Sequence, residues 1–395
     1  MSSRGPAVPR SPSLDRLPEY PLGDLPARRA AVEARGIRVL NLGPGDADLL
    51  PPPRVVERLR EVVLESRYSR YGFQRGLPEF REEAAGWMER RFGVVADPYE
   101  ELHPLIGSKE GLAHLLLGCL GPGDVAILPD PGFHSYEGAV IMAGAEPHLV
   151  RLSPENGYRL DPEALPGGVV DRARILLLNY PNNPTAASVE LDYFQRIVEF
   201  CREKGIGLIH DHAYSEIAFD GYRPPSVLQV PGAEEVAVEL HSLSKTYNMT
   251  GWRLGWAVGN RRFIRNLVEV KSLVDTGPPL AIQAAGLEAL RSPEAWMREN
   301  VELFRRRRDV GVQAFRDAGF RLQVPRATIY LWVAVPGGWS SAEFCRRALN
   351  EVGVVLLPGS SFGAGGEGYF RAALTVDEPE LQEAAERLAG LEPAS

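Results

Sequence analysis

The sequence of 395 residues contains three cysteines, no surplus of positive charge and no long apolar run. Cys119, Cys201 and Cys345 are odd in number and widely spaced, which predicts reduced, buried thiols rather than a metal site. The net charge of −8 and the pI near 5.6 offer no broad cationic surface to nucleic acid or anionic lipid. No apolar stretch reaches the roughly 20 residues that cross a membrane, so a membrane protein is not expected.

The opening residues, MSSRGPAVPRSP, lack the apolar centre of a signal peptide, and a cytoplasmic location is therefore expected. Because Pro and Ser dominate them, residues 1–17 are predicted to form a mobile tail. The whole chain, with 44% hydrophobic and 24% charged residues, has the composition of a globular protein. A chain of this length is expected to fold into two lobes.

Lysine is scarce, since only four of the 44 basic residues are lysines. One of them, Lys245, follows an apolar run and two serines, Ser242 and Ser244, in HSLSKTYNMTGWR. Arginine cannot form an imine, whereas a desolvated lysine amine near other cations becomes a nucleophile for a carbonyl carbon. The retention of lysine at this position indicates an enzyme that uses a Schiff base.

Five short apolar runs between residues 105 and 260 predict strands: VAILPDPG, RILLLNYPNNP, GIGLIHDHAY, VAVELHSLSK and RLGWAVGN. Continuous apolar runs are typical of a parallel sheet covered by helices on both faces. Residues 191–204 carry an apolar stripe and end at Gly205, which predicts a crossover helix. Further helices are expected at 27–37, 54–66, 78–91 and near 378–390.

Beyond about residue 290, the helix-like segment MRENVELFRRRRDVGVQAFRDAG precedes the strand-like YLWVAVP. This alternation predicts a smaller α+β lobe. The segment VLNLGPGDADLLPPP, with Gly43 and Gly45, is interpreted as a connector between the lobes or as a loop that faces the substrate.

Polar residues follow three of the predicted strands: Asn179 to Asn183, Asp211 with Tyr214, and Ser242 to Lys245. In open α/β sheets, ligands bind in the crevice at the carboxyl ends of the strands. These three groups are therefore expected to converge on one site.

Two groups of residues are candidates for binding a phosphate. Gly107, Ser108 and Lys109 precede a helical segment, and the start of a helix attracts anions. Arg253, eight residues after Lys245, has the planar fork that suits phosphate. The alternatives are a simple helix cap for the first group and an exposed ion pair for Arg253.

Two further candidates suit an aromatic ring that carries a nitrogen and an oxygen. A carboxylate at a buried sheet edge, such as Asp211, needs a cationic partner, which a protonated pyridine nitrogen would provide. Asn182 and Asn183, held between two prolines, could direct an amide at a ring oxygen, although composition alone favours a surface turn here. An amine, phosphate donors and an acid together describe a site for pyridoxal 5'-phosphate (PLP).

Several motifs occur in the order seen in class I/II aminotransferases, which are PLP enzymes of fold type I. They are the Tyr71–Gly76 pattern, GSKEG, PDPGF, NYPNNPT, DHAY, SLSKT, GWRLG and YFRAAL. The resemblance runs from about residue 18 to the C-terminus, and the wording is most similar to the LL-diaminopimelate aminotransferase branch. It implies an α/β fold with a large, mostly parallel, seven-stranded sheet and a smaller α+β domain. The implied division is an arm at 18–53, a large PLP domain at 54–290 and a small domain at 291–395.

The resemblance also implies roles for individual residues. Lys245 would form the imine and later move the substrate Cα proton. Asp211 would keep the pyridine nitrogen protonated, Asn183 and Tyr214 would bind the ring oxygen, and Phe133 would stack on the ring.

The remaining implied roles concern the phosphate and the substrate. The implied phosphate ligands are Ser108, Lys109, Ser242 or Ser244, and Arg253. Tyr71 would reach the phosphate of a neighbouring subunit, which implies a homodimer with shared sites. Arg371 would bind the substrate α-carboxylate, assisted by the Gly45 backbone and Asn183.

Four positions depart from the family pattern. Ala186 replaces the usual Gly of NPTG and Ala47 replaces a frequent Pro, but neither change removes a catalytic group. Pro278 and Pro279 differ from the branch in a segment that would border the partner's site, so they bear on the substrate.

The expected reaction is transfer of an amino group from an L-amino acid to a 2-oxo acid, such as 2-oxoglutarate or pyruvate, with ping-pong kinetics. A PLP-dependent carbon–sulfur lyase would use the same residues and is the alternative. A PLP-sensing regulator would need an added DNA-binding segment, which neither the short leader nor the acidic balance supports.

Overall fold

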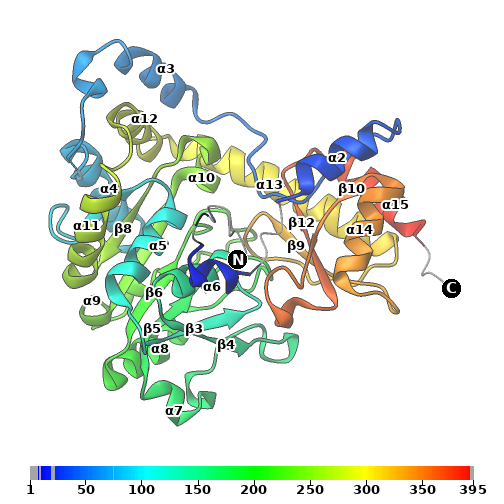
Figure 1. The fold of residues 1–395 in the computed structure, drawn as a ribbon. Coiled ribbons are helices and arrows are strands. Elements are labelled where there is room, and N and C mark those ends of the chain that lie inside the picture. Colours follow the sequence, from blue (N-terminus) through cyan, green and yellow to red (C-terminus); the bar gives the residue numbers. More distant parts are fainter. Residues whose placement is uncertain (1–7, 9, 19–22, 74, 392–395) are drawn as a thin grey trace, which may run out of the picture.

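The computed structural model describes residues 8, 10–18, 23–73 and 75–391. Figure 1 shows two lobes, a large one that contains the main sheet and a small one that contains the C-terminal helices. Of the predicted N-terminal tail, residues 1–7 and 9 lie outside the described residues. Within the rest of the tail, Pro12–Asp15 form a short helix, α1, that lies against α6 (Ser135–Met142).

The large lobe is built on a seven-stranded sheet with strand order β2-β8-β7-β6-β5-β3-β4. All neighbouring strands from β7 to β4 pair in parallel, whereas β8 is antiparallel to both of its neighbours. The predicted α/β class with a mostly parallel sheet is confirmed. The strands are β2 Leu102–Leu105, β3 Val125–Asp130, β4 Glu146–Arg151, β5 Ala173–Leu178, β6 Gly207–Asp211, β7 Ala237–Ser242 and β8 Gly255–Gly259.

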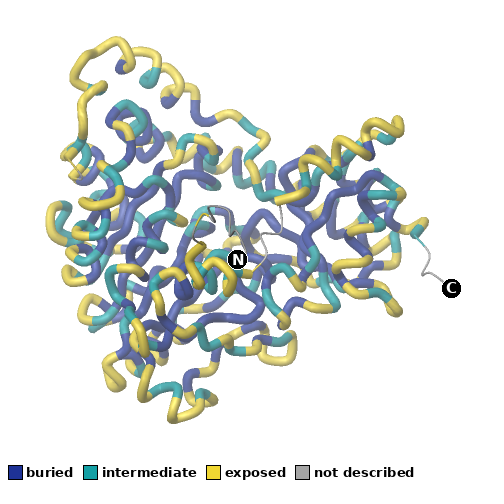
Figure 2. Tube along the Cα trace, in the orientation of Figure 1, coloured by how far each residue is buried: buried dark blue, intermediate teal, exposed yellow. Residues whose placement is uncertain are grey.

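Helices cover both faces of this sheet. On one face, α5 (Ser108–Cys119) and α11 (Arg261–Val274) pack together over the central strands, next to α6. On the other face, α8 (Leu191–Lys204) covers β5 and β6 with its apolar stripe, while α4 (Pro78–Phe92) and α12 (Leu280–Leu290) pack near β8. In Figure 2 the central strands are buried and the outer faces of the helices are exposed.

The predicted crossover helix has the predicted bounds, because its local sequence fixes both its packing and its end. Tyr193, Phe194, Ile197 and Val198 are buried on one side of α8. Gly205 follows with φ of 66°, in the left-handed conformation that ends helices and favours glycine.

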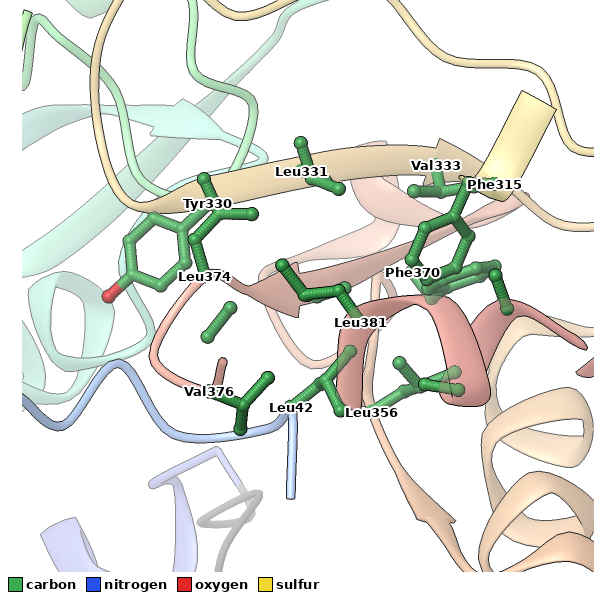
Figure 3. Packing of buried hydrophobic residues seen from close by; sticks show 14 of the residues in the cluster. Leu42, Phe315, Tyr330, Leu331, Val333, Leu356, Phe370, Leu374, Val376 and Leu381 are labelled. Atoms are coloured by element: carbon green, nitrogen blue, oxygen red, sulfur yellow. The ribbon is translucent and has the colours of Figure 1, made fainter. Parts of the chain in front are cut away.

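The small lobe contains an antiparallel sheet of order β11-β12-β9 and a parallel pair, β1 with β10. Its strands are β1 Leu40–Asn41, β9 Tyr330–Ala334, β10 Val354–Val355, β11 Leu357–Pro358 and β12 Tyr369–Ala373. Its helices are α2 Leu25–Glu33, α13 Glu294–Asp317, α14 Ser341–Val352 and α15 Glu378–Ala389. Figure 3 shows how Leu331, Phe370 and Leu381 pack between the sheet and α15. Burial of this apolar surface stabilises the lobe.

The remaining short elements connect these layers. They are α3 Pro53–Val62, α7 Gly167–Val170, α9 Ala233–Val236, α10 Leu243–Thr246, and the 3-10 helices at Ser66–Ser69, Pro154–Asn156, Pro162–Ala164, Val227–Gln229, Thr250–Trp252 and Ala364–Gly366. None of the helices among the described residues combines the length and the apolar character needed to cross a membrane. The residue boundaries of the two domains, at 53/54 and 290/291, stay a prediction.

His103 of β2 makes stability depend on pH. The side chain is 1% exposed, and burial, followed by the cations Lys271 and Arg81, lowers the pKa of His103 to about 3. The unfolded chain therefore binds a proton below pH 6.5 that the native chain does not bind, and stability falls as the pH falls from 6.5 towards 3. At pH 5 this costs about 2 kcal/mol.

Replacement of His103 by Gln removes this proton-linked cost. Urea unfolding at pH 7 and pH 5 is expected to show a smaller loss of stability for His103→Gln than for the unchanged protein. His148→Gln, on edge strand β4, serves as the control. An equal pH dependence in His103→Gln and the unchanged protein would contradict this explanation.

Candidate active site

A cavity of about 410 Å³ lies at the carboxyl ends of β5, β6 and β7, where residues of both lobes meet. As expected, the three polar groups at the ends of β5, β6 and β7 converge on this cavity. Every predicted site residue except Tyr71 lines this cavity: Gly45, Ser108, Lys109, Phe133, Asn183, Asp211, Tyr214, Ser242, Ser244, Lys245, Arg253 and Arg371.

Asp211 lies at the floor of the cavity, at the end of β6, and is 8% exposed. Its Oδ2 accepts a hydrogen bond of 2.9 Å from the Tyr136 hydroxyl, whereas Oδ1 has no donor among the described residues. Burial raises the pKa of Asp211, and the hydrogen bond from Tyr136 and the charge of His210 oppose this effect. A buried carboxylate oxygen without a donor fits a cationic or N–H ligand group.

Lys245 extends into the cavity from α10, the short helix that follows β7 directly. Ser242 caps α10, because its Oγ accepts a hydrogen bond of 3.1 Å from the Ser244 amide. Lys245 Nζ donates to the Gly45 carbonyl. Burial lowers the pKa of Lys245, and Tyr330 and Asp46 partly offset this effect. The lowered pKa brings the amine closer to its nucleophilic, uncharged form.

The loop around Gly45 approaches the site very closely. A Cβ atom at Gly45 would lie 2.0 Å from the Tyr330 hydroxyl oxygen, so no other residue fits without displacing that tyrosine. Arg307 of α13 holds the loop through Asp48, with two bonds of 2.8 and 2.6 Å. The segment is therefore a wall of the site as well as a connection between lobes.

Arg371 of β12 faces Asp211 and Lys245 from the small lobe and is 4% exposed. Its Nη1 donates to Asn183 Oδ1 and its Nη2 to the Gly43 carbonyl, each at 2.7 Å. Its Nε has no acceptor among the described residues. A buried guanidinium with an unused donor fits an anionic ligand such as a carboxylate.

Asn183 belongs to a loop that is buried, although its composition favoured a surface turn. Asn182 and Asn183 are 2% and 4% exposed. Asn179 Oδ1 accepts from the Asn183 amide at 2.8 Å, and Asn182 Oδ1 accepts from the Thr185 amide at 3.0 Å. These internal bonds replace water, which allows the polar loop to be buried.

Tyr330 contacts several site residues and was not among the residues predicted from the sequence. Its hydroxyl lies 3.0 Å from that of Tyr214, and the Arg371 guanidinium lies 4.0 Å from its ring centre. Burial alone would raise the pKa of Tyr330, but Arg371 and Lys245 lower it. Burial raises the pKa of Tyr214 well above its usual value.

The start of α5 forms the cationic end of the cavity. Gly107 precedes this helix with φ of 79°, and a Cβ atom there would lie 2.3 Å from Arg253 Nη2. Lys109 lies 5.7 Å from the centre of the Phe133 ring. Burial lowers the pKa of Lys109, and the charge of Arg253 lowers it further. An anion between these two cations at a helix N-terminus would be stabilised.

Gly107→Ala is expected to weaken anion binding at this end about tenfold, because the added methyl group would displace the Arg253 guanidinium. The affinity for PLP, measured by fluorescence titration, would test this. Gly93→Ala is a matched control, since Gly93 has φ of 69° but open space around its Cβ position. Equal PLP affinity in both variants would contradict the expected role of Gly107.

Tyr71 and Ala186 lie apart from these contacts. Tyr71 does not line the cavity and is 69% exposed. Ala186, where the family usually has Gly, adopts φ of 58° in the left-handed region that favours glycine. Alanine is therefore held here in a backbone conformation that glycine adopts with less strain.

Comparison with known proteins identifies the family. The aminotransferase class I and II family matches residues 37–388. An LL-diaminopimelate aminotransferase of Desulforudis audaxviator is 46% identical, over 95% of both chains.

Two solved structures are also similar. Substrate-bound BacF from Bacillus subtilis has a TM-score of 0.94 with 32% identity, covering 97% of this chain and 98% of that one. A probable N-succinyldiaminopimelate aminotransferase from Thermus thermophilus has a TM-score of 0.88 with 39% identity, covering 92% and 98%. The chain belongs to the aminotransferase class I and II family.

Proposed function

We propose that the protein binds PLP in this cavity and transfers an amino group from LL-diaminopimelate, or a close derivative of it, to 2-oxoglutarate or pyruvate. One observation carries the proposal. The cavity contains a buried acceptor without a donor, Asp211 Oδ1, and a buried donor without an acceptor, Arg371 Nε. PLP and an amino acid together supply both missing partners, a protonated ring nitrogen and an α-carboxylate.

The residues around the cavity fit each part of this cofactor. Lys245 would hold the aldehyde carbon, Asp211 the ring nitrogen, and Tyr214 with Asn183 the ring oxygen. Phe133 would cover the ring face. The phosphate would lie at the cationic end of the cavity, held by Ser108, Lys109, Ser242, Ser244 and Arg253.

Arg371 and Lys245 would then have separate roles in the reaction. Arg371 binds the α-carboxylate and so orients the substrate Cα hydrogen towards Lys245. The Lys245 amine, released by the incoming amino group, removes that proton and returns it at a different carbon. PLP, when bound, supplies the electron-accepting ring that makes this proton acidic.

Two similar proteins support the proposed substrate, because the substrates in their names both contain diaminopimelate. The test is a half-reaction screen, in which the loss of cofactor absorbance is recorded with each amino acid and no 2-oxo acid present. LL-diaminopimelate is expected to react at least about tenfold faster than alanine or aspartate, a difference of 1.4 kcal/mol. A faster reaction with another amino acid would refute the substrate. Pyruvate release from cysteine or cystathionine without an acceptor would refute the transferase in favour of a lyase.

We also propose that the protein acts as a homodimer with shared sites. The support is the exposure of Tyr71 and its absence from its own subunit's cavity. Sedimentation would measure the oligomeric state, and a purely monomeric active enzyme would refute the proposal. The cytoplasmic location expected from the sequence stays a prediction.

A further inference from the structure

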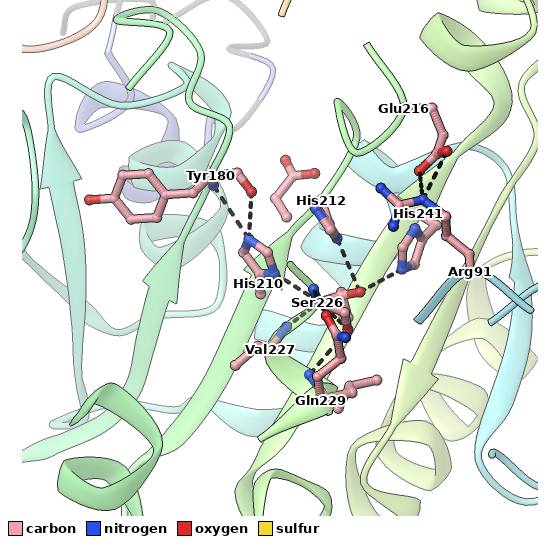
Figure 4. Close-up of polar contacts among 12 residues, drawn as sticks. Arg91, Tyr180, His210, His212, Glu216, Ser226, Val227, Gln229 and His241 are labelled. Carbon is pink, nitrogen blue, oxygen red and sulfur yellow. Dashed lines mark hydrogen bonds and ion pairs between the residues drawn. The ribbon is translucent and has the colours of Figure 1, made fainter. Parts of the chain in front are cut away.

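A cluster of ionisable side chains lies beneath the site, on the face of the sheet covered by α8 and α4. His210 and His212 flank Asp211 in sequence and point to the opposite face of the sheet, where they meet Glu239 and His241 of β7 (Figure 4). All four side chains are at most 1% exposed. Nothing in the proposed reaction uses them directly.

Glu239 is the centre of the cluster. Its Oε2 accepts from His210 Nδ1 at 2.9 Å, from Ser226 Oγ at 3.0 Å and from the Val227 amide at 3.0 Å. Its Oε1 accepts from His241 Nε2 at 2.6 Å. A carboxylate that receives this many donors is stabilised as an anion.

The charges of the other members follow from their surroundings. Burial alone would raise the pKa of Glu239, but the surrounding histidines lower it well below its usual value. Burial lowers the pKa of His212 to about 3, so this ring is neutral. Outside the cluster, Arg91 of α4 pairs with Glu216, with Nε and Oε1 3.0 Å apart (Figure 4).

His210 faces an acceptor with each of its ring nitrogens. Nδ1 lies 2.9 Å from Glu239 Oε2, and Nε2 lies 2.9 Å from the Tyr180 carbonyl oxygen. The Tyr180 amide also donates towards Nε2, at the longer distance of 3.4 Å. A neutral imidazole protonated on Nδ1 could accept this long bond but would leave the closer Tyr180 carbonyl without a donor, whereas the imidazolium donates to both acceptors.

We propose that Glu239 is a positioning residue for the active site: it holds His210 as an imidazolium, and this cation braces the Tyr180–Asn183 loop and keeps Asp211 ionised. The part of the proposal that concerns Asp211 rests on the proposed function, because a protonated cofactor ring requires an ionised Asp211. The contact of His210 with the Tyr180–Asn183 loop does not depend on the proposed function.

The proposal is consistent with the positions of the three strand ends. Glu239 lies on β7, which ends at Ser242 and leads into α10 with Lys245. His210 precedes Asp211 on β6, and Tyr180 lies in the loop that carries Asn183 after β5. One ion pair therefore connects the elements that present the amine, the acid and the amide. The positive charge of His210 also opposes the effect of burial on the pKa of Asp211.

The first experiment determines the protonation of His210 directly. Side-chain ¹⁵N–¹H NMR of histidine-labelled full-length protein, with and without PLP, is expected to show one histidine with two N–H signals at pH 7.5. His210→Gln assigns that signal by removing it. A single N–H on His210 would overturn the proposal, and so would an equimolar metal ion in the purified protein, because a metal would take the nitrogen lone pairs. This result does not depend on the reaction, so it can fail or succeed separately from the proposed function.

The second experiment tests the effect on the site. In Glu239→Gln, His210 is expected to lose its second N–H signal, and kcat is expected to fall about tenfold at pH 8.5, with KM changed less than threefold. Glu239→Asp, which keeps a carboxylate, should retain both His210 N–H signals and recover part of the lost kcat. Glu216→Gln, which breaks the neighbouring ion pair, is the control and should leave the His210 signals and kcat unchanged. A fall in kcat for Glu239→Gln with both His210 N–H signals intact would indicate a merely structural role and overturn the proposal.

Discussion

Lys245→Ala is expected to reduce turnover by about 10⁴-fold or more, the upper range for loss of a single acid–base group. The amine both holds the cofactor and moves the Cα proton in the proposed reaction, so no neighbouring group replaces it. Stopped-flow measurement of the half-reaction with the preferred amino acid would give the rate. The variant should fold normally, because the Lys245 side chain ends in the cavity.

Lys204→Ala is the matched control for this variant. Lys204 lies at the exposed end of α8, where it pairs with Glu203. Its loss should leave the rate unchanged. The free energy of unfolding should also stay within about 0.5 kcal/mol of that of the unchanged protein. Lys245→Arg separates charge from chemistry, since arginine keeps the cation but cannot form an imine. Substantial activity in Lys245→Arg would exclude Lys245 as the nucleophile.

Asp211→Asn is expected to lower kcat by about 10³-fold while PLP remains bound, the size of effect seen when a preorganised electrostatic partner is removed. The amide has nearly the same shape as the carboxylate and can still accept the bond from Tyr136. It cannot hold a protonated ring nitrogen as an ion pair, so the electron-accepting ability of the ring falls. Steady-state kinetics with a PLP binding assay would separate the two effects.

Asp130→Asn is the control for Asp211→Asn. Asp130 ends β3, which lies two strands away from β6 in the sheet. It is also buried and accepts from the Gly365 amide at 2.7 Å, but it does not line the cavity. Its replacement should alter stability more than kcat. Equal losses of kcat in both variants would mean that Asp211 acts through stability and not through the cofactor.

The central strands could be predicted from the sequence, whereas the edges of the sheet could not. β5, β6 and β7 are buried almost throughout, and each contains adjacent apolar residues. β2 has four residues including a proline, and β4 is an edge strand whose residues are largely exposed or half-buried. The antiparallel direction of β8 depends on how the chain returns to the sheet, which a local pattern does not record.

In the site, too, some residues could be predicted from the local sequence and others depend on tertiary packing. The groups at the ends of three strands could be predicted, because strand ends in a parallel sheet share one edge. Tyr330 begins a strand of the other lobe, and only the packing of the two lobes brings it to Tyr214. The proposed role of Glu239 could not be predicted either, because the local sequence does not show that three histidines surround this acidic residue.

The most direct test of the account is to locate the covalent attachment of the cofactor. The protein would be saturated with PLP, reduced with borohydride, digested and analysed by mass spectrometry. A phosphopyridoxyl group on Lys245 is the predicted result. The same group on Lys109, Lys204 or Lys271 instead, or no labelled peptide from saturated protein, would contradict it.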